Sequence, residues 1–134
     1  MKKKILLVDD DAQTILMLSS RLKANGYEVS SATSGPECIK LIHEFEPDLI
    51  FLDFVMPAME GIDVLHKLKA ENKAQNIPII VLTAARRENL EARCVQAGAK
   101  AVILKPFNPS ELLALVQKAF DPNSKWRRVE NIGK

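Results

Sequence analysis

Five polar side chains stand directly after short apolar segments of the sequence, and together they have the composition of a phosphoryl-transfer site. They are Asp9, Asp10, Asp53, Thr83 and Lys105, which follow the apolar residues 5–8, 49–52, 79–82 and 101–104. Three carboxylates placed close together would force one of them to take up a proton unless a cation lay between them. Ligands that are all oxygen, without histidine or thiolate, favour Mg2+ over zinc.

Magnesium beside a carboxylate suits the transfer of a phosphoryl group to that carboxylate. The cation neutralises the phosphoryl oxygens and polarises phosphorus while the carboxylate attacks. The ammonium group of Lys105 is a point charge for a second phosphoryl oxygen, and the hydroxyl of Thr83 can bond a third. The set therefore predicts phosphoryl transfer to an aspartate.

Each of these residues also has an ordinary structural explanation. Asp11 is expected to cap the first helix, Asp53 could be a turn residue, Thr83 could be a cap, and Lys105 could be a solvated loop lysine. What favours a site is that the residues stand at the ends of different apolar segments.

The apolar segments themselves are too short for helices and too continuously apolar for half-exposed strands. We interpret them as strands buried on both faces, as in a parallel sheet. Residues 27–32 alternate loosely between apolar and polar, which suits an edge strand. A stretch of helical period follows each of the five strands. The apolar positions of these helices are Ile15, Leu18 and Leu22; Cys38, Leu41, Ile42 and Phe45; Ile62, Leu65 and Leu68; Leu90, Cys94 and Ala97; and Leu112, Leu113, Val116 and Phe120.

The alternation of strand and helix, five times over, predicts an α/β fold: a three-layer, doubly wound (βα)5 sandwich. The edge-like second strand favours a flavodoxin-like parallel sheet of order 2-1-3-4-5. In that order strands one and three flank the switch point, where ligands bind beside the carboxyl ends of the strands. Asp9, Asp10 and Asp53 should therefore converge in one crevice, with Thr83 and Lys105 on its far rim.

Length and composition are those of one compact domain. The chain has 134 residues, of which 47% are hydrophobic and 27% charged, and its net charge of +2 gives no reason to expect direct contact with nucleic acid. No apolar run is long enough for membrane insertion, and the N-terminus lacks a signal peptide, so a cytoplasmic location is expected. Cys38 and Cys94 are expected to be buried core thiols, and His43 and His66 to lie on the surface of helices.

Four motifs give the sequence a specific resemblance. They are Leu6-Leu7-Val8-Asp9-Asp10, Asp53-x-x-Met56-Pro57-x-x-x-Gly61, Thr83-Ala84 and Lys105-Pro106-Phe107. From about Lys3 to Phe120 the chain resembles a receiver domain of the two-component response-regulator family, of the single-domain, chemotaxis-regulator-like kind. The second motif is the most specific, because acidic pairs and Lys-Pro pairs are individually weak signals.

The resemblance implies a metal-binding role for the acidic residues. Asp53 would be the phosphoacceptor. Mg2+ would be bound by Asp10, Asp53 and the backbone carbonyl of Val55, and Asp9 would act mainly through a metal-bound water.

The same resemblance implies the phosphoryl-binding and switch positions. Lys105 would hold the phosphoryl group, Thr83, followed by Ala84, would move to bond it, and the Lys105–Pro106 peptide bond is expected to be cis. The family usually has an aromatic residue three positions before the lysine, but this chain has Val102. A valine cannot report the movement of the threonine by a large rotamer change, so output is expected to depend more on backbone movement of the loop after Thr83 and of the fourth helix.

A second departure concerns the lifetime of the phosphorylated state. Relatives that lose phosphate quickly carry polar side chains two residues after the phosphoacceptor and two after the threonine, where this chain has Val55 and Ala85. Without a polar group to orient water, self-dephosphorylation is expected to be slow. The chain would then be a stoichiometric phosphoacceptor and not a turnover enzyme.

Three other classes of protein remain as alternatives. A haloacid-dehalogenase-type phosphohydrolase would use Asp9-Asp10-Asp11 as its nucleophile motif, but Gln13 stands where that motif has Thr or Val. A flavin or nucleotide carrier would need a phosphate-binding loop after strand one, where three aspartates would repel a phosphate. A degenerate receiver that serves only as a protein-binding scaffold would need none of the site residues.

We expect residues 1–120 to form the receiver (phosphoacceptor) domain and residues 121–134 a polar C-terminal tail, with no output domain. Whether the chain is a stand-alone regulator or a fragment of a longer one stays open. The resemblance implies a phosphohistidine donor on a sensor histidine kinase or a histidine phosphotransfer domain. The signal would leave through the surface of the fourth helix, fifth strand and fifth helix, toward a downstream protein target or an output domain in a longer parent.

Overall fold

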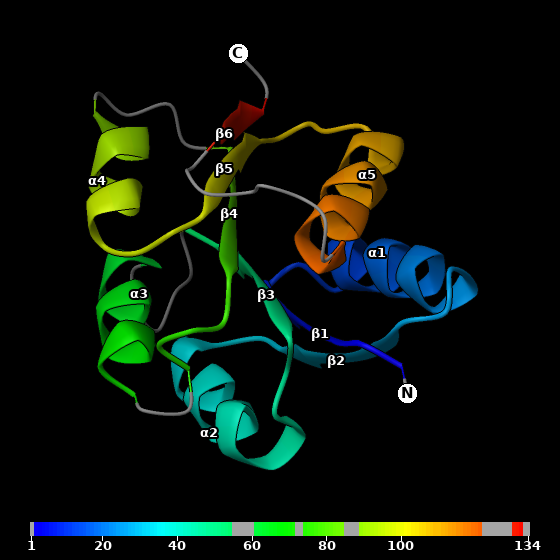
Figure 1. The fold of residues 1–134 in the computed structure, drawn as a ribbon, viewed down its shortest axis with the longest axis horizontal. Helices are drawn as coiled ribbons and strands as arrows, with labels where there is room; N and C mark the ends of the chain where they lie inside the picture. The colour runs from blue at the N-terminus through cyan, green and yellow to red at the C-terminus, as the bar shows by residue number, and fades with distance from the viewer. Residues whose placement is uncertain (1, 55–60, 72–73, 85–88, 122–129, 133–134) are drawn as a thin grey trace.

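A computed structural model describes residues 2–54, 61–71, 74–84, 89–121 and 130–132 of the chain. Strands and helices alternate along it, as the sequence predicts (Figure 1). The elements in chain order are β1 (Lys4–Val8), α1 (Ala12–Ala24), β2 (Glu28–Ala32), α2 (Gly35–Phe45), β3 (Leu49–Asp53), α3 (Gly61–Ala70), β4 (Ile79–Thr83), α4 (Leu90–Gln96), β5 (Ala101–Leu104), α5 (Pro109–Phe120) and β6 (Glu130–Ile132).

The strands form one parallel sheet of order β2-β1-β3-β4-β5-β6, which confirms the predicted order for the first five. The register aligns the carboxyl ends of the central strands, because Val8 pairs with Leu52 and Asp53 pairs with Leu82. The residues that follow β1 and β3 therefore emerge at the same edge of the sheet, on either side of the switch point.

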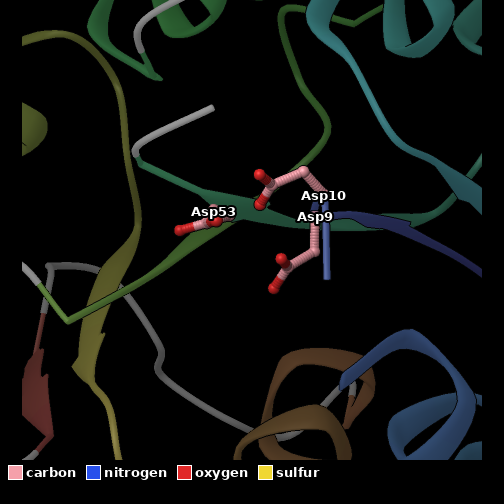
Figure 2. A group of neighbouring side chains, drawn as sticks. All are labelled: Asp9, Asp10 and Asp53. Atoms are coloured by element: carbon pink, nitrogen blue, oxygen red, sulfur yellow. The ribbon is translucent and has the colours of Figure 1, made fainter. Parts of the chain in front are cut away.

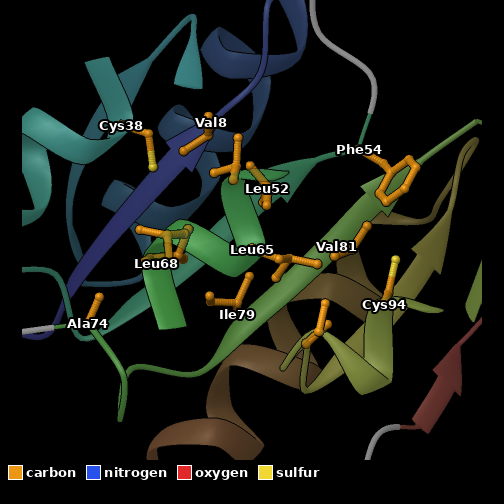
Figure 3. Packing of buried hydrophobic residues seen from close by; sticks show 14 of the residues in the cluster. Val8, Cys38, Leu52, Phe54, Leu65, Leu68, Ala74, Ile79, Val81 and Cys94 are labelled. Atoms are coloured by element: carbon orange, nitrogen blue, oxygen red, sulfur yellow. The ribbon is translucent and has the colours of Figure 1, made fainter. Parts of the chain in front are cut away.

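Helices α1 and α5 cover one face of the sheet, and α2, α3 and α4 cover the other (Figure 1). Strands buried on both faces send consecutive side chains into opposite cores. Leu6 of β1 belongs to the core under α2, α3 and α4, while its neighbour Leu7 belongs to the core under α1 and α5. Figure 3 shows the former, to which α2, α3 and α4 contribute Cys38, Leu65 and Cys94.

Helix termini use the capping residues that the sequence offers. Asp11 caps α1 as predicted, since its side chain accepts a hydrogen bond from the N–H two residues on. Asn108 caps α5, because its Oδ1 accepts a hydrogen bond from Ser110 N at 2.9 Å. The chain leaves α1 and α4 through Gly26 and Gly98, whose φ angles of 92° and 111° favour glycine.

The segment expected to be a polar tail contains a further strand in its described part. β6 runs parallel to β5, with Glu130 opposite Ala101 and Ile132 opposite Ile103. Three residues are too few to show a period of two, so the sequence pattern did not reveal this strand.

The thiols and imidazoles lie where the sequence predicts. Cys38 and Cys94 are buried without a disulfide, and burial raises their pKa values to about 12 and about 11. His43 and His66 are exposed on α2 and α3, and His43 Nε2 lies 3.1 Å from Glu71 Oε2. Across the described ranges, no helix combines the length and the apolarity needed to cross a membrane.

Candidate functional site

The end of β1 fixes the first two aspartates. The N–H of Asp9 donates a hydrogen bond to Ala32 O at 3.1 Å, which ties the chain to the end of β2. Asp9 is 4% exposed, and its Oδ1 accepts a hydrogen bond from Asp11 N at 2.9 Å. Asp10, between them, is exposed. Asp9 is therefore held by the backbone around it, whereas Asp10 stays accessible from solvent.

The third aspartate is the last residue of β3. Asp53 pairs with Leu82, and the next residue, Phe54, donates its N–H to Leu82 O at 3.2 Å. Asp53 is 7% exposed, and Phe54 is buried in the core of Figure 3. A paired strand and an anchored aromatic ring thus position this carboxylate.

Asp9, Asp10 and Asp53 meet at the carboxyl ends of β1 and β3 (Figure 2). One carboxylate oxygen from each of them lies within 4.8 Å of the other two. Two ligands of a single Mg2+ stand at most about 4.2 Å apart, which is twice the usual Mg–O distance. The three side chains therefore need only a small movement, or one bridging water, to share the ion. Their oxygens suit a hard divalent cation better than a soft metal.

Lys105 reaches this cluster from the end of β5. Its Nζ lies 2.9 Å from Asp9 Oδ2 and 3.9 Å from Asp53 Oδ1, and its side chain is only 22% exposed. The N–H of Lys105 donates to Thr83 O at 2.8 Å, and the peptide bond to Pro106 is cis. The ammonium group is thus directed inward, onto the acidic cluster.

Thr83 ends β4 and is fully buried, whereas Ala84 after it is exposed. Because Leu82 is the partner of Asp53, Thr83 stands one residue beyond that partner on the neighbouring strand. On its other side Thr83 pairs with Leu104, the residue before the lysine. The threonine therefore lies between the acidic strand and the strand that carries the cation.

Gly61 shows why the motif that begins at Asp53 ends in glycine. The N–H of Gly61, the first residue of α3, donates to Phe54 O at 2.6 Å. A Cβ atom on Gly61 would lie 2.5 Å from Phe54 O and 2.6 Å from Phe54 Cα, so a side chain has no room. Val55, the expected carbonyl ligand, and Ala85 lie outside the described residues.

Val102 occupies the position where an aromatic residue is usual in the family that the sequence resembles. It is 2% exposed, pairs with Val81, and belongs to the core that includes Leu90 and Cys94 of α4. A buried β-branched side chain is stiff at χ1. Movement of β5 at this point would therefore act on the core to which α4 also contributes.

Asp11 lies beside the cluster but is bound to α1. Hydrogen bonds from Thr14 Oγ1 at 2.9 Å and from Gln13 N at 3.0 Å lower the pKa of its carboxyl group, and the charge of Lys105 adds to this. Its carboxylate is engaged by the helix terminus, so Asp11 is not one of the grouped metal-ligand candidates.

The contact between Lys105 and Asp9 is the feature that sequence reasoning missed. The sequence suggested a metal-directed role for Asp9 and a phosphoryl-directed role for Lys105, whereas the two side chains contact each other here. This contact could have been predicted from the opposite charges of the two side chains, because the ends of their strands were already predicted to converge.

Comparison with known proteins identifies the class of protein. Residues 5–117 match the model of the response regulator receiver domain. The chain belongs to this family. The DNA-binding response regulator MtrA of Mycolicibacterium paratuberculosis is 37% identical to it over 117 residues, which are 87% of this chain and 51% of MtrA. The phosphate regulon transcriptional regulatory protein PhoB of Pseudomonas aeruginosa is 38% identical over 112 residues, which are 84% of this chain and 49% of PhoB.

Solved structures of other response regulators have the same fold as this receiver domain. The chemotaxis response regulator CheY4 of Vibrio cholerae matches 90% of this chain and 100% of its own, with a TM-score of 0.83 and 30% identity. A two-component response regulator from Clostridium difficile matches 92% of this chain and 100% of its own, with a TM-score of 0.86 and 25% identity. The receiver domain spans about half the length of the curated relatives named above. Membership of this family sets aside the phosphohydrolase and flavin-carrier alternatives.

Proposed function

We propose that this receiver domain is a magnesium-dependent phosphoacceptor, in which Asp53 takes a phosphoryl group from a phosphohistidine. The observation that carries the proposal is the meeting of three carboxylates within 4.8 Å, with Lys105 Nζ 3.9 Å from Asp53. Acidic turns are common, but a largely buried ammonium group from a distant strand is not expected beside an ordinary solvated turn.

The chain's own residues would hold the metal. Asp10 and Asp53, together with the carbonyl oxygen of Val55, would bind Mg2+, and Asp9 would act through a bound water. Bound there, Mg2+ neutralises the charge on the phosphoryl oxygens. The mutual repulsion of the carboxylates supplies the affinity for a divalent cation, since Lys105 offsets only one of their charges.

In the transfer, a carboxylate oxygen of Asp53 bonds to phosphorus while the bond from phosphorus to the imidazole nitrogen breaks and its electron pair stays with the imidazole. Before transfer, Lys105 Nζ lies 2.9 Å from Asp9 Oδ2 and 3.9 Å from Asp53 Oδ1. After transfer, it contacts a phosphoryl oxygen on Asp53. The hydroxyl of Thr83 donates a hydrogen bond to another phosphoryl oxygen.

The new contacts of Lys105 and Thr83 with the phosphoryl group act on the ends of β4 and β5 together, because Lys105 N bonds Thr83 O. Val102, three residues earlier on β5, packs in the same core as Leu90 of α4. We therefore assign the output to the surface of α4, β5 and α5. Phosphorylation would favour a conformer of this surface that is minor in the free protein.

The partners follow from this chemistry. The donor is a sensor histidine kinase or a histidine phosphotransfer domain, and the target is a protein or an output domain of a longer parent. The receiver domain covers residues 1–120 and works in the cytoplasm. It is a stoichiometric acceptor whose aspartyl phosphate is lost slowly, because neither Val55 nor Ala85 offers a polar side chain to orient water.

Treatment with phosphoramidate and Mg2+, followed by intact mass measurement, tests the proposal. The unaltered chain should gain one phosphoryl group. The Asp53→Asn variant should gain none, and neither should the unaltered chain when EDTA removes the metal. Asp11→Asn is the matched control, because it makes the same change on a neighbouring carboxylate outside the cluster. Phosphorylation of the Asp53→Asn chain, for example on Asp9, or transfer without a divalent cation would contradict the proposal. Decay of the added mass after removal of the donor measures the lifetime.

A further inference from the structure

The outer edge of β5 carries a strand from the chain's own C-terminal segment. β6 lies beside β5 in parallel, with Ala101 opposite Glu130, Val102 opposite Asn131 and Ile103 opposite Ile132. In Figure 1 it is the red arrow next to β5, at the edge of the sheet between α4 and α5. β6 thus covers the strand edge of the surface to which we assign the output.

A helix lies between β5 and β6 in the sequence, as it does between each earlier pair of consecutive strands. A parallel partner needs a crossover of a dozen or more residues, usually a helix, and α5 supplies it between β5 and β6. β5 is apolar throughout, and an apolar strand with an unpaired edge is a template for pairing with another chain. The edge of β5 would therefore be open to pairing with another chain, and β6 of the same chain occupies it.

The attachment of β6 is short. Three residues form few backbone hydrogen bonds with β5, each of small net worth, and the cost of ordering three residues offsets most of that gain. The strand can therefore leave the edge without loss of the five-stranded core, whose two hydrophobic clusters lie under the five helices.

We propose that Glu130–Ile132 is a detachable strand that occupies the β5 edge of its own chain and competes with protein partners that dock there. The partner that fits this edge is an extended segment that runs parallel to β5 and pairs through its backbone. The proposal rests on the proposed function for the use of this surface as output, while the strand itself is tested independently of it.

The covalent connection between α5 and β6 favours pairing of β5 with its own chain's β6 over pairing with the β6 of a second copy. β6 follows α5 on the same chain, and a short connection gives an effective concentration on the order of millimolar at the edge. A second copy at micromolar concentration, or a partner with a weaker strand, would therefore be excluded until β6 leaves.

The alternation of the sheet supplies an internal control for the test. Lys105 N bonds Thr83 O of β4 at 2.8 Å, and N–H groups along a strand alternate between its two neighbours. The amide of Ile103 therefore faces β4, and that of Val102 faces β6. Because Val102 is opposite Asn131, the next residue of β6, Ile132, directs its own N–H at β5. Removal of β6 should expose the amide of Val102 to exchange and leave that of Ile103 protected.

The experiment compares Ile132→Pro with Ile132→Ala in the full chain by NMR hydrogen exchange. Proline removes the N–H that faces β5 and fixes φ, so it should detach β6, whereas alanine keeps the backbone able to pair. The exchange of Val102 should accelerate by about tenfold or more in Ile132→Pro alone, while that of Ile103 stays unchanged. A synthetic peptide of residues 129–134, added at millimolar concentration, should slow the exchange of Val102 again.

Two results would overturn the proposal. One is equal exchange of Val102 in both variants. The other is protection that disappears on dilution together with a dimer in sedimentation, since the strand would then come from a second copy. Uptake of phosphate from phosphoramidate by Ile132→Pro should match that of the unaltered chain. If no variant is phosphorylated, the proposed acceptor function fails while the exchange result on β6 stands.

Discussion

Among single residues, Lys105 controls the charge balance of the site. Its ammonium group contacts the buried Asp9 and lies within 4 Å of Asp53, so it competes with a metal for the same carboxylates. In the proposed transfer, the same group contacts a phosphoryl oxygen on Asp53. The proposal therefore predicts that Lys105 weakens metal binding and speeds phosphorylation, and these two effects can be measured separately.

Replacement of Lys105 by methionine keeps the length of the side chain and removes its charge. We expect the affinity for Mg2+ to rise by about tenfold, because the carboxylates lose their internal cation. The rate of phosphorylation by phosphoramidate should fall by about 100-fold, since a charge aimed at the transferred group is lost. Calorimetric titration with MgCl2 and intact mass measure the two effects.

Lys40→Met is the matched control, because Lys40 is an exposed lysine on α2 and its loss changes the net charge equally. It should change neither quantity by more than about twofold, since exposed charges at a distance are screened. A Lys105→Met chain that binds Mg2+ no more tightly than the unaltered one would show that the ammonium group does not compete with the metal.

At the scale of elements, the backbones at the end of β3 and the start of α3 approach each other closely. Gly61 at the start of α3 donates its N–H to Phe54 O, and Phe54 directly follows Asp53, the proposed phosphoacceptor. The sequence identifies this glycine as part of a motif. Its physical reason, the approach of two backbones, appears only in three dimensions.

Gly61→Ala should destabilise the domain by about 3 kcal/mol, because the added Cβ meets backbone atoms of Phe54 that cannot move aside as a flexible side chain would. Urea unfolding measures this change in free energy. Gly26→Ala is the control: its φ of 92° is unfavourable for alanine, but nothing lies within 4 Å of the added Cβ. We expect a cost of about 1 kcal/mol there. Equal costs at the two positions would mean that the start of α3 relaxes freely.

The elements themselves were largely predictable, and the exceptions have physical causes. Strands buried on both faces of a parallel sheet are continuously apolar, so residues 49–52 and 79–82 stood out in the sequence. The end of α5 is marked only by the loss of period after Phe120. β6 is defined by its pairing with β5 and not by its own composition, so no pattern within Glu130–Ile132 reveals it.

At the scale of the whole molecule, the topology made the convergence of the site predictable. The strand order places the ends of β1 and β3 together, so the meeting of Asp9, Asp10 and Asp53 follows from the fold. The contact of Lys105 with Asp9 did not follow, because the path of a long side chain depends on the local backbone and on competing charges.

The helices of the molecule differ in length and in capping. α2 has 11 residues and two side-chain bonds at its start: Ser34 Oγ accepts from Glu37 N at 3.3 Å, and Glu37 Oε1 accepts from Thr33 N at 2.7 Å. α4 has 7 residues, and Asn89 at its start has a left-handed φ of 60° and no capping bond from its side chain within the described residues. α4 is therefore the helix that we expect to open first, and it borders the surface assigned to output.

Cys38 on α2 and Cys94 on α4 report this difference, because both are buried in the same core. Their raised pKa values, about 12 and about 11, leave almost no thiolate near pH 8 in the folded protein, so alkylation requires opening. Iodoacetamide labelling, followed by peptide mass measurement, should modify Cys94 at least about tenfold faster than Cys38, since α4 can open without global unfolding. In urea above the unfolding midpoint the two rates should become equal, which controls for intrinsic reactivity. Equal rates under native conditions would mean that the core opens as one unit, and α4 could then not move separately from the rest of the fold.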